Sequence, residues 1–301
     1  MKLSVIICTY NREKYIYNVL KSIAENDFST EKFEIILVNN NSTDKTEAEC
    51  KRFQSDFPQI RFHYFVEENQ GLSYARNRGI EEAAGDILVY VDDDAVVDKG
   101  YLQAHYSFFE HNLSAMAAGG PVLPLYEAQK PKWMSHFTLQ LITGYIYKGK
   151  LISEFKRGEY PIGANTAFRK SVFEQVGFFN VDLGRKGDGL MGAEEKDIFD
   201  KMRSSGLKYY YIPDAILYHI ISETKLTKDY FDRLTYSIGQ SERIRTKAIS
   251  KWKYAKRIIS EGVKWAVSLF LFMGYTLALM PQKGWKLIVF RWNVTRGLIE
   301  K

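Results

Sequence analysis

Three consecutive carboxylates close an apolar segment in the first third of the chain. Residues 87–91 are apolar or aromatic, and Asp92, Asp93 and Asp94 follow directly. Such a segment predicts a buried parallel strand, and open α/β sheets bind ligands at the carboxyl ends of strands. Because adjacent negative charges repel, a cation is needed there, and oxygen ligands suit Mg²⁺ or Mn²⁺ shared with substrate phosphates. The pattern indicates a nucleoside diphosphate site, and the simpler alternative is a solvated acidic turn.

A second candidate binding loop follows the first predicted strand, at residues 3–8. It consists of Thr9, Tyr10, Asn11 and Arg12. The ring of Tyr10 offers a flat face on which a nucleotide base can stack, and the Thr9 hydroxyl can hydrogen-bond to the edge of that base. The alternative for Tyr10 is an ordinary core aromatic.

A third candidate is Arg76, in a helix predicted from Gly71 to about residue 84. Its guanidinium fork matches the oxygens of a phosphate or the edge of a base. The alternative is a surface ion pair, which contributes little to stability.

These residues need a scaffold that brings strand ends together. In residues 1–98, strands and helices alternate at the spacing of β-α-β units. The predicted strands are 3–8, 33–38, 60–66 and 87–91, and the predicted helices are 14–25, 46–53 and 71–84. We therefore predict an α/β fold with a doubly wound, mostly parallel sheet whose polar clusters share one edge.

Residues 99–225 are predicted to complete the same domain with a less regular pattern. We expect helices at 101–110, 171–176 and 193–204 and strands at 116–122, 209–212 and 215–218, the last of them ending at His219. Residues 124–158 are aromatic, basic and irregular, which predicts a mobile loop region.

The C-terminal part, residues 226–301, is predicted to be a helical extension. The 16 residues from 265 to 280 carry no charge and follow a basic tract, within a chain of formal charge +6. This combination indicates an anionic membrane surface rather than nucleic acid. The uncharged run is shorter than the roughly 20 residues that a spanning helix needs. Three interpretations stay open: a core helix, a hairpin that dips into one leaflet, and a short span.

Composition fits an intracellular protein with a large core. The chain has 301 residues, 46% of them hydrophobic, which is ample for one large domain with an appendage. Cys8 and Cys50 form no C-x-x-C pair, as expected of a reduced compartment, and the chain opens in a strand without a signal-peptide pattern. We expect a cytoplasmic protein at the cytoplasmic face of the inner membrane.

Together these motifs resemble those of glycosyltransferase family 2 over roughly residues 1–235. The matching segments are 4–12, 35–44, 69–77, 92–94, 163–169, 192–197 and 213–219. The resemblance implies the GT-A fold and an inverting, metal-dependent transfer of sugar from a nucleotide sugar. It also implies that residues 1–98 bind the nucleotide and that 99–225 face the acceptor, where Asn165 and Arg169 would shape the pocket.

The resemblance also implies roles for the donor side. Asp92 would hold the ribose and Asp94 the metal, although Asp93 could replace either because the triplet permits a shift of one residue. His219 would approach the metal or the diphosphate, and a buried structural histidine is its alternative. Family members commonly have Asp at the position of Asn39, where it accepts from the base, so uracil recognition is expected but not secured.

The catalytic base is implied by a Glu-Glu pair at a helix start, where the family usually has Glu-Asp. Glu195 takes the position of the base, Glu194 is the alternative, and Asp197 completes the motif. A helix N-terminus stabilises a carboxylate there. Without the resemblance, all three would be ordinary acids of a first helical turn.

The function expected is transfer of a hexosyl or N-acetylhexosaminyl group from a UDP-sugar, with Mn²⁺ or Mg²⁺, to a hydroxyl acceptor. The acceptor would be a carbohydrate or a lipid-linked sugar, in polysaccharide or glycolipid assembly, with peripheral or monotopic membrane contact and no nucleic acid. A sugar nucleotidylyltransferase is disfavoured because residues 8–12 contain no glycine for a phosphate loop. A non-catalytic nucleotide-sugar-binding module is the third alternative.

Overall fold

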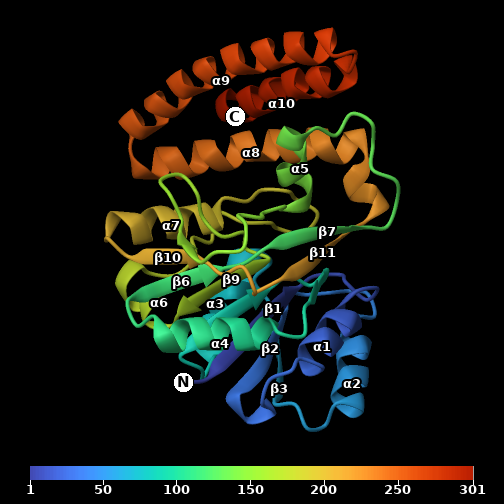
Figure 1. Ribbon diagram of the computed structural model, residues 1–301, viewed down its shortest axis with the longest axis vertical. Coiled ribbons are helices and arrows are strands. Elements are labelled where there is room, and N and C mark those ends of the chain that lie inside the picture. The colour runs from blue at the N-terminus through green and yellow to red at the C-terminus, as the bar shows by residue number, and fades with distance from the viewer. Residues whose placement is uncertain (301) are drawn as a thin grey trace. The chain divides into compact units, whose positions relative to one another are not determined.

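The computed structural model describes residues 1–300, and the chain divides into two compact units (Figure 1). The sheet unit comprises residues 1–125, 144–181 and 195–220. The helical unit comprises residues 126–143, 182–194 and the chain from residue 221 onward. The helical unit therefore gathers two internal segments in addition to the C-terminal extension.

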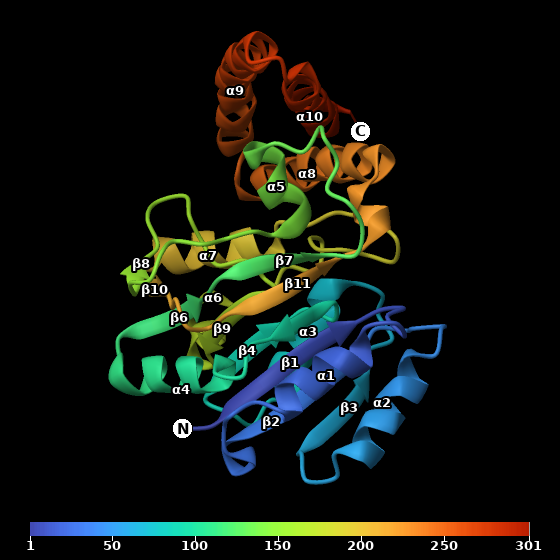
Figure 2. The same cartoon turned by 45° about the vertical axis from the view of Figure 1, so that its right-hand side comes forward.

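The sheet unit is built on eight strands in the order β3-β2-β1-β4-β9-β6-β10-β8 (Figure 2). Their bounds are β1 Leu3–Thr9, β2 Phe33–Asn39, β3 Phe62–Val66, β4 Ile87–Val91, β6 Ala115–Gly119, β8 Ser153–Glu154, β9 Asn165–Arg169 and β10 Lys208–Tyr211. Strands β3, β2, β1 and β4 are parallel, β9 runs antiparallel to β4 and β6, and β8 is antiparallel to β10. The predicted α/β fold with a mostly parallel sheet is confirmed.

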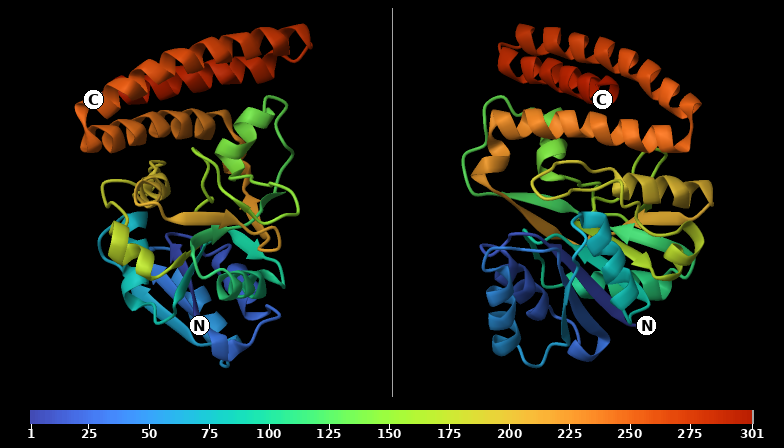
Figure 3. Two further views of the ribbon diagram at one scale, coloured as in Figure 1. Left: turned by 60° about the vertical axis from the view of Figure 1, so that its left-hand side comes forward. Right: turned by 180° about the vertical axis from the view of Figure 1, so that it is seen from behind.

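Helices cover both faces of this sheet because alternate side chains of each strand point to opposite sides. Leu3, Val5 and Ile7 pack in one core cluster, and Ile6 packs in another. The first cluster includes α1 Ile16–Ala24, α2 Thr46–Asp56 and α4 Tyr101–His111, and the second includes α3 Leu72–Glu82, α6 Ser171–Val176 and α7 Glu194–Ser204. The front and rear views show these two sets on opposite faces (Figures 1 and 3).

A second, three-stranded sheet has the order β5-β11-β7. Its strands are β5 Ala95–Val97, β11 Leu217–Ile221 and β7 Val122–Tyr126. The prediction that His219 ends a strand at 215–218 was wrong, because His219 is the middle residue of β11 and pairs with Ala95. The apolar pattern resumes after His219 with Ile220 and Ile221, and both residues belong to the strand. The strand predicted at 116–122 was also wrong in its bounds, because its residues are divided between β6 and β7.

Residues 124–158 are more ordered than predicted, since they contain α5 His136–Thr143 as well as β8. Ser135 caps this helix: its backbone N–H donates to the Thr138 hydroxyl (2.8 Å), and the Thr138 N–H donates back to the Ser135 hydroxyl (3.3 Å). Trp133 and Ile142 bury their side chains with Phe231 in the core of the helical unit. That core forms between segments far apart in sequence, so a local pattern does not reveal it.

The helical unit also contains three long helices, α8 Lys228–Ile249, α9 Lys251–Leu277 and α10 Pro281–Ile299 (Figure 3). Their starts follow local capping rules: the Thr227 and Ser250 hydroxyls accept from the first turns of α8 and α9, and Pro281 occupies the first turn of α10. A Cβ at Gly239 or Gly297 would collide with the backbone of the opposing helix, so α8 and α10 cross at very short distance.

Candidate active site

The loops after β1 and β2 are joined at the carboxyl edge of the sheet. The backbone N–H of Asn11 donates to the Ser42 hydroxyl (2.9 Å), and the Asn11 side-chain oxygen accepts from the N–H of Thr43 (2.8 Å). The backbone N–H of Arg12 donates to the Thr46 hydroxyl (2.9 Å). Asn11 adopts φ +53°, a left-handed conformation that asparagine tolerates better than most residues. These bonds fix the loop that carries Thr9 and the half-buried Tyr10.

Asn39 ends β2 and has both ends of its amide engaged. Its oxygen accepts from the N–H of Ser42 (2.9 Å), and its nitrogen donates to the Tyr64 hydroxyl (2.7 Å). A carbonyl oxygen has two lone pairs, so one acceptor position remains for a further donor. Asn39 is therefore held in one orientation at the sheet edge.

Asn40 is a site-building residue that the sequence analysis missed. Its amide nitrogen donates to the carbonyls of Glu67 (2.9 Å) and Asn69 (2.8 Å), and its oxygen accepts from the N–H of Gly71 (2.7 Å). These bonds position the loop that leads into α3 and hence Arg76. The available signal was an asparagine at a strand end, a residue type that commonly bonds to loop backbone.

The acidic triplet lies between β4 and β5, and charged side chains converge on it. The Arg12 Nε lies 3.0 Å from Asp93 Oδ1, and the Arg12 Nη2 lies 3.9 Å from Asp94 Oδ2. The His219 Nε2 lies 3.0 Å from Asp94 Oδ1, because the β5–β11 register sets His219 opposite Ala95. Arg12 thus supplies one of the cations that the triplet requires.

Three ligand atoms gather within 4.8 Å of one another, one each from Asp92, Asp94 and His219. Two carboxylates and one imidazole form a donor set that suits Mn²⁺ and accommodates Mg²⁺. Asp93 is directed to Arg12 instead. Burial raises the pKa of the Asp93 carboxyl to about 6, against the lowering effect of Arg12. The residues present therefore fit a divalent cation.

A carboxylate on α7 faces the arginine on α3. The Arg76 Nη2 lies 2.8 Å from Glu195 Oε1, and the Arg76 guanidinium also lies over the ring of Phe179 at 5.3 Å. A Cβ at Gly163 would collide with the Glu195 carboxylate, so a larger residue there would displace that carboxylate. Glu194 is 3% exposed, whereas the Glu195 side chain is 26% exposed. Of the two, Glu195 is the carboxylate that an incoming molecule can reach.

Comparison with known proteins identifies the architecture. The family model described as Glycosyl transferase family 2 matches residues 4–177, more than half of the chain. The chain belongs to glycosyltransferase family 2. The family was predicted from the motifs, and the match confirms it.

Relatives and solved structures agree with this family. The glucosyl-dolichyl phosphate glucuronosyltransferase of Haloferax volcanii is 30% identical, over 81% of this chain and 77% of the relative. An uncharacterized glycosyltransferase of Bacillus subtilis is 36% identical, over 82% of this chain and 72% of the relative. The structure resembles the mannosyltransferase of Pyrobaculum calidifontis in complex with GDP-Man and Mn²⁺, with a TM-score of 0.64 and 18% identity over 100% of this chain and 88% of that chain. It also resembles Staphylococcus aureus TarS in complex with UDP-GlcNAc, with a TM-score of 0.56 and 18% identity over 98% of this chain and 91% of that chain. The fold is GT-A.

Within this glycosyltransferase fold, two predicted acceptor-side residues have structural contacts. Asn165 is fully buried, donates to the carbonyls of Pro121 (2.9 Å) and Ala215 (2.8 Å), and accepts from the Tyr101 hydroxyl (3.0 Å). It joins β9 to the chain beside the small sheet. Its role is to hold the strand next to the acidic turn, since Asn165 pairs with Val91.

Arg169 lies away from the acidic turn. It pairs with Ile87, at the opposite end of β4, and its guanidinium donates to the carbonyls of Phe109 and Ala115 (both 2.8 Å). These carbonyls lie near the end of α4 and the start of β6, so Arg169 stabilises that connection. The structure does not bring Arg169 together with the other predicted site residues.

Asp197 lies one turn into α7 and is largely buried. Its carboxylate forms an ion pair with Lys201, four residues later, at 2.8 Å. Asp197 therefore belongs to the helix that carries Glu195, and its ion pair with Lys201 stays within that helix.

Proposed function

We propose that this protein is an inverting, metal-dependent glycosyltransferase that uses a UDP-sugar and a lipid-linked acceptor. The observation that carries the proposal is the convergence of Asp92, Asp94 and His219 within 4.8 Å at the end of β4. The same edge of the sheet carries Thr9 and Tyr10, which suit a nucleoside. The transferred group would be a hexosyl or N-acetylhexosaminyl group.

The donor side would work by charge and stacking. Tyr10 stacks on the base, Asn39 accepts from its edge, and Asp92, Asp94 and His219 hold Mn²⁺ or Mg²⁺. When bound, the ion supplies Lewis-acid stabilisation to the departing diphosphate. Arg12 holds Asp93 in place and adds positive charge beside the phosphates.

The acceptor side would work by general-base catalysis at Glu195. Its carboxylate takes the proton of the acceptor hydroxyl as that oxygen attacks the anomeric carbon, and the bond to the diphosphate oxygen breaks on the opposite face. The configuration of the sugar is thereby inverted. Arg76 orients the carboxylate from one side, at 2.8 Å, and Gly163 leaves room for it. Glu194 is buried and would not take this proton.

The acceptor class rests on the relatives. The archaeal relative is named for glucosyl-dolichyl phosphate, a lipid-linked sugar. A lipid-linked acceptor fits glycolipid or polysaccharide assembly at the cytoplasmic face of the inner membrane. The domain assignment to residues 1–225 and 226–301 also stays a prediction.

The test is release of nucleoside diphosphate by the full chain from a panel of UDP- and GDP-sugars, with and without Mn²⁺. UDP-sugars with Mn²⁺ should be used best. Asp94→Ala should abolish metal-dependent UDP binding in calorimetry, and the matched variant of an exposed carboxylate, Asp27→Ala, should not. Unchanged UDP affinity in Asp94→Ala would refute the metal assignment. UDP-sugar binding without turnover, even with acceptor extracts, would favour the non-catalytic module.

A further inference from the structure

Helix α9 exposes apolar side chains along one face. Each of these side chains is more than half exposed, and their spacing of three or four residues places them on one stripe. The stripe consists of Ile259, Val263, Val267, Phe270, Met273 and Leu277. A helix on the surface of a protein in water normally turns its polar face outward, whereas α9 turns its apolar face outward.

The opposite face of α9 is polar and packs inward. Glu261 and Ser268 are buried, and the Trp265 indole N–H donates to the Thr295 hydroxyl of α10 at 2.9 Å. Arg257 lies on the same face, four residues before Glu261. The polar side of α9 is therefore occupied by its helical neighbours, and the apolar side has no cover from the described residues.

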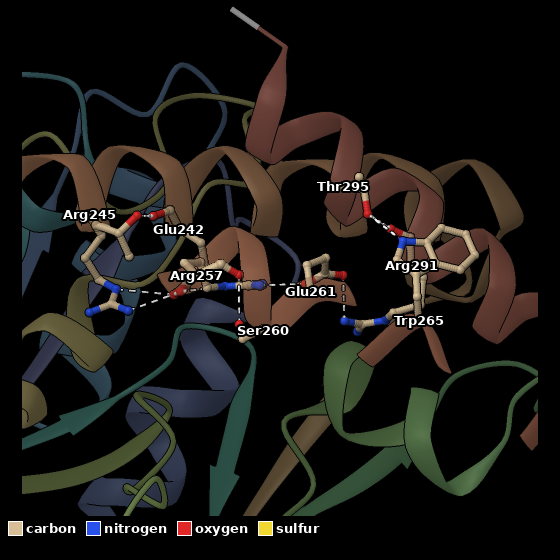
Figure 4. Close-up of polar contacts among 9 residues, drawn as sticks. Glu242, Arg245, Arg257, Ser260, Glu261, Trp265, Arg291 and Thr295 are labelled. Carbon is tan, nitrogen blue, oxygen red and sulfur yellow. Dashed lines mark hydrogen bonds and ion pairs between the residues drawn. The ribbon is translucent and has the colours of Figure 1, made fainter. Parts of the chain in front are cut away.

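Alternating charges connect α9 to α8 and α10 (Figure 4). Glu242 lies 3.1 Å from Arg245 and 3.3 Å from Arg257, all measured between carboxylate oxygens and guanidinium nitrogens. Glu261 lies 2.6 Å from Arg257 and 2.9 Å from Arg291. We call these five residues the charge ladder. Removing α9 from its neighbours would leave buried charges unpaired, which strongly destabilises a protein.

The ladder decides against a membrane span. Among the described residues, one helix, Lys251–Leu277, is long and apolar enough to cross a membrane, judged by length and composition alone. Its uncharged part, residues 265–277, covers only about 20 Å at 1.5 Å per residue, less than the roughly 30 Å of a hydrocarbon core. The preceding turns carry the ladder, which ties them to α8 and α10. Helix α9 therefore suits the surface of a bilayer.

Tryptophans reinforce this assignment. All five tryptophans of the chain belong to the helical unit, and Trp252, Trp285 and Trp292 are each more than half exposed. Tryptophan concentrates at membrane interfaces, where its ring is apolar and its N–H stays wet. Trp285 packs against Phe272 of α9, with ring centroids 6.3 Å apart, so this tryptophan also joins α10 to α9.

A basic cleft opens beside the turn between α9 and α10. It has a volume of about 710 Å³ and is lined by residues 130–132, Met134 and residues 279–283. Lys130, Lys132 and Lys283 contribute its charges, and none of its described lining residues is acidic. Leu279, 89% exposed, borders the same cleft. Lysine side chains together with apolar lining residues match a phosphate joined to acyl chains.

We propose that the α9–α10 hairpin lies flat in the interface of a membrane of anionic phospholipids. The apolar stripe of α9 would enter the acyl region, and the lysine cleft would bind a lipid phosphate. The inference deepens the proposed lipid-linked acceptor, because it states how the enzyme reaches that acceptor. Vesicle binding is measured without donor or acceptor, so the two proposals can fail separately.

The experiment is co-sedimentation of the full chain with phosphatidylcholine vesicles, with and without phosphatidylglycerol. The chain should bind the anionic vesicles, with a blue shift of tryptophan fluorescence. Replacing the three cleft lysines by glutamine should weaken this binding by about 100-fold, because each lysine near an anionic membrane surface contributes about 1 kcal/mol to binding. Val267→Ser combined with Phe270→Ser should weaken binding to both kinds of vesicle.

Matched variants distinguish an effect of the proposed membrane-binding surface from a general effect of lower charge or hydropathy. Lys2, Lys99 and Lys150 are exposed in the sheet unit, and their replacement by glutamine should leave vesicle binding unchanged. The same holds for Leu113→Ser with Leu151→Ser, both 79% exposed in that unit. Thermal unfolding of every variant checks that the fold survives.

Five outcomes would overturn the proposal. The first is a full chain that ignores anionic vesicles. The second is equal loss of binding in the matched variants. The third is self-association that Phe270→Ser abolishes without vesicle binding, which would assign the stripe to a second copy of the chain. The fourth is release of the chain from anionic vesicles by millimolar inorganic phosphate alone, which would make the cleft a site for the free ion. Stronger tryptophan quenching by bromines at the bilayer centre than near the headgroups would replace the flat arrangement by a span.

Discussion

The acidic turn of the sheet unit and the charge ladder of the helical unit both bury charge, but they balance it differently. At the acidic turn, Arg12 and His219 face three aspartates. In the ladder, each glutamate contacts two arginines at 3.3 Å or less. In the first cluster the carboxylates outnumber the cations that face them, and in the second each glutamate is saturated by two arginines.

This difference separates a ligand site from a structural one. A cluster with surplus negative charge gains from binding a cation, so its charges are available for function. A cluster in which ions pair with one another is costly to break but offers little to a ligand. The comparison predicts that changes at the edge of the sheet impair chemistry, and that changes in the ladder impair folding.

The largest expected effect is on turnover at Glu195. Glu195→Gln keeps the hydrogen bond to Arg76 but removes the basic carboxylate, so kcat should fall about 10²–10⁴-fold while donor affinity stays nearly unchanged. Glu194→Gln is the control and should change kcat much less, because Glu194 is buried. Steady-state transfer kinetics measure both. The reverse ranking of the two variants would move the base to Glu194.

The second effect is on stability and tests the ladder directly. Glu261→Gln removes the negative charge that pairs with Arg291, so the free energy of unfolding should fall by about 3 kcal/mol in urea titrations. UDP binding should survive wherever the variant is folded. Glu300→Gln, at an exposed pair with Arg296, should change stability little. Equal losses in the two variants would contradict the saturated ladder.

A third effect, of pH, belongs to the sheet unit. Burial lowers the pKa of His105 from its ordinary value of 6.5 to about 4. The unfolded chain then binds more protons between these values, so this contribution to stability is complete above pH 6.5 and is lost as pH falls toward 4. The loss should approach roughly 3 kcal/mol. His105→Phe should flatten the dependence in urea titrations across that window, and an unchanged pH slope would refute the assignment.

The smallest effect is expected at Asn39. Asn39→Asp keeps an acceptor for the N–H of Ser42, and the Tyr64 hydroxyl can reverse its bond to donate to the carboxylate. UDP affinity in calorimetry should therefore change by less than about fivefold, within roughly 1 kcal/mol. Loss of UDP binding would mean that the Asn39 nitrogen itself recognises the ligand.

The sequence was informative where the physics is local. Residues 87–91 predict a strand, and β4 has those bounds, because an apolar run of five residues is typical of a buried parallel strand. The helix predicted at 193–204 is α7, which begins one residue later. By contrast, α5 was missed because its apolar residues are covered by Phe231, almost a hundred positions further along the chain.

The site shows the same division. The sequence indicated Asp94 and His219 as ligands, but their separation of 3.0 Å depends on the β5–β11 pairing. Asn40 escaped notice because an asparagine at a strand end has many uses, and its three loop partners lie 27 to 31 residues away. Arg169 was placed near the acceptor from its motif alone, whereas the antiparallel direction of β9 carries it to the other end of β4.

The sequence by itself determined the residue types at the strand ends, the alternation that gives a parallel sheet, and the apolar character of residues 265–280. Tertiary structure decided which face of α9 is covered, since periodicity describes a stripe but not its partner. It also decided that Arg76 meets Glu195, 119 residues later, rather than solvent. Composition and spacing act along the chain, whereas pairing between distant charges depends on the packing that brings their helices together.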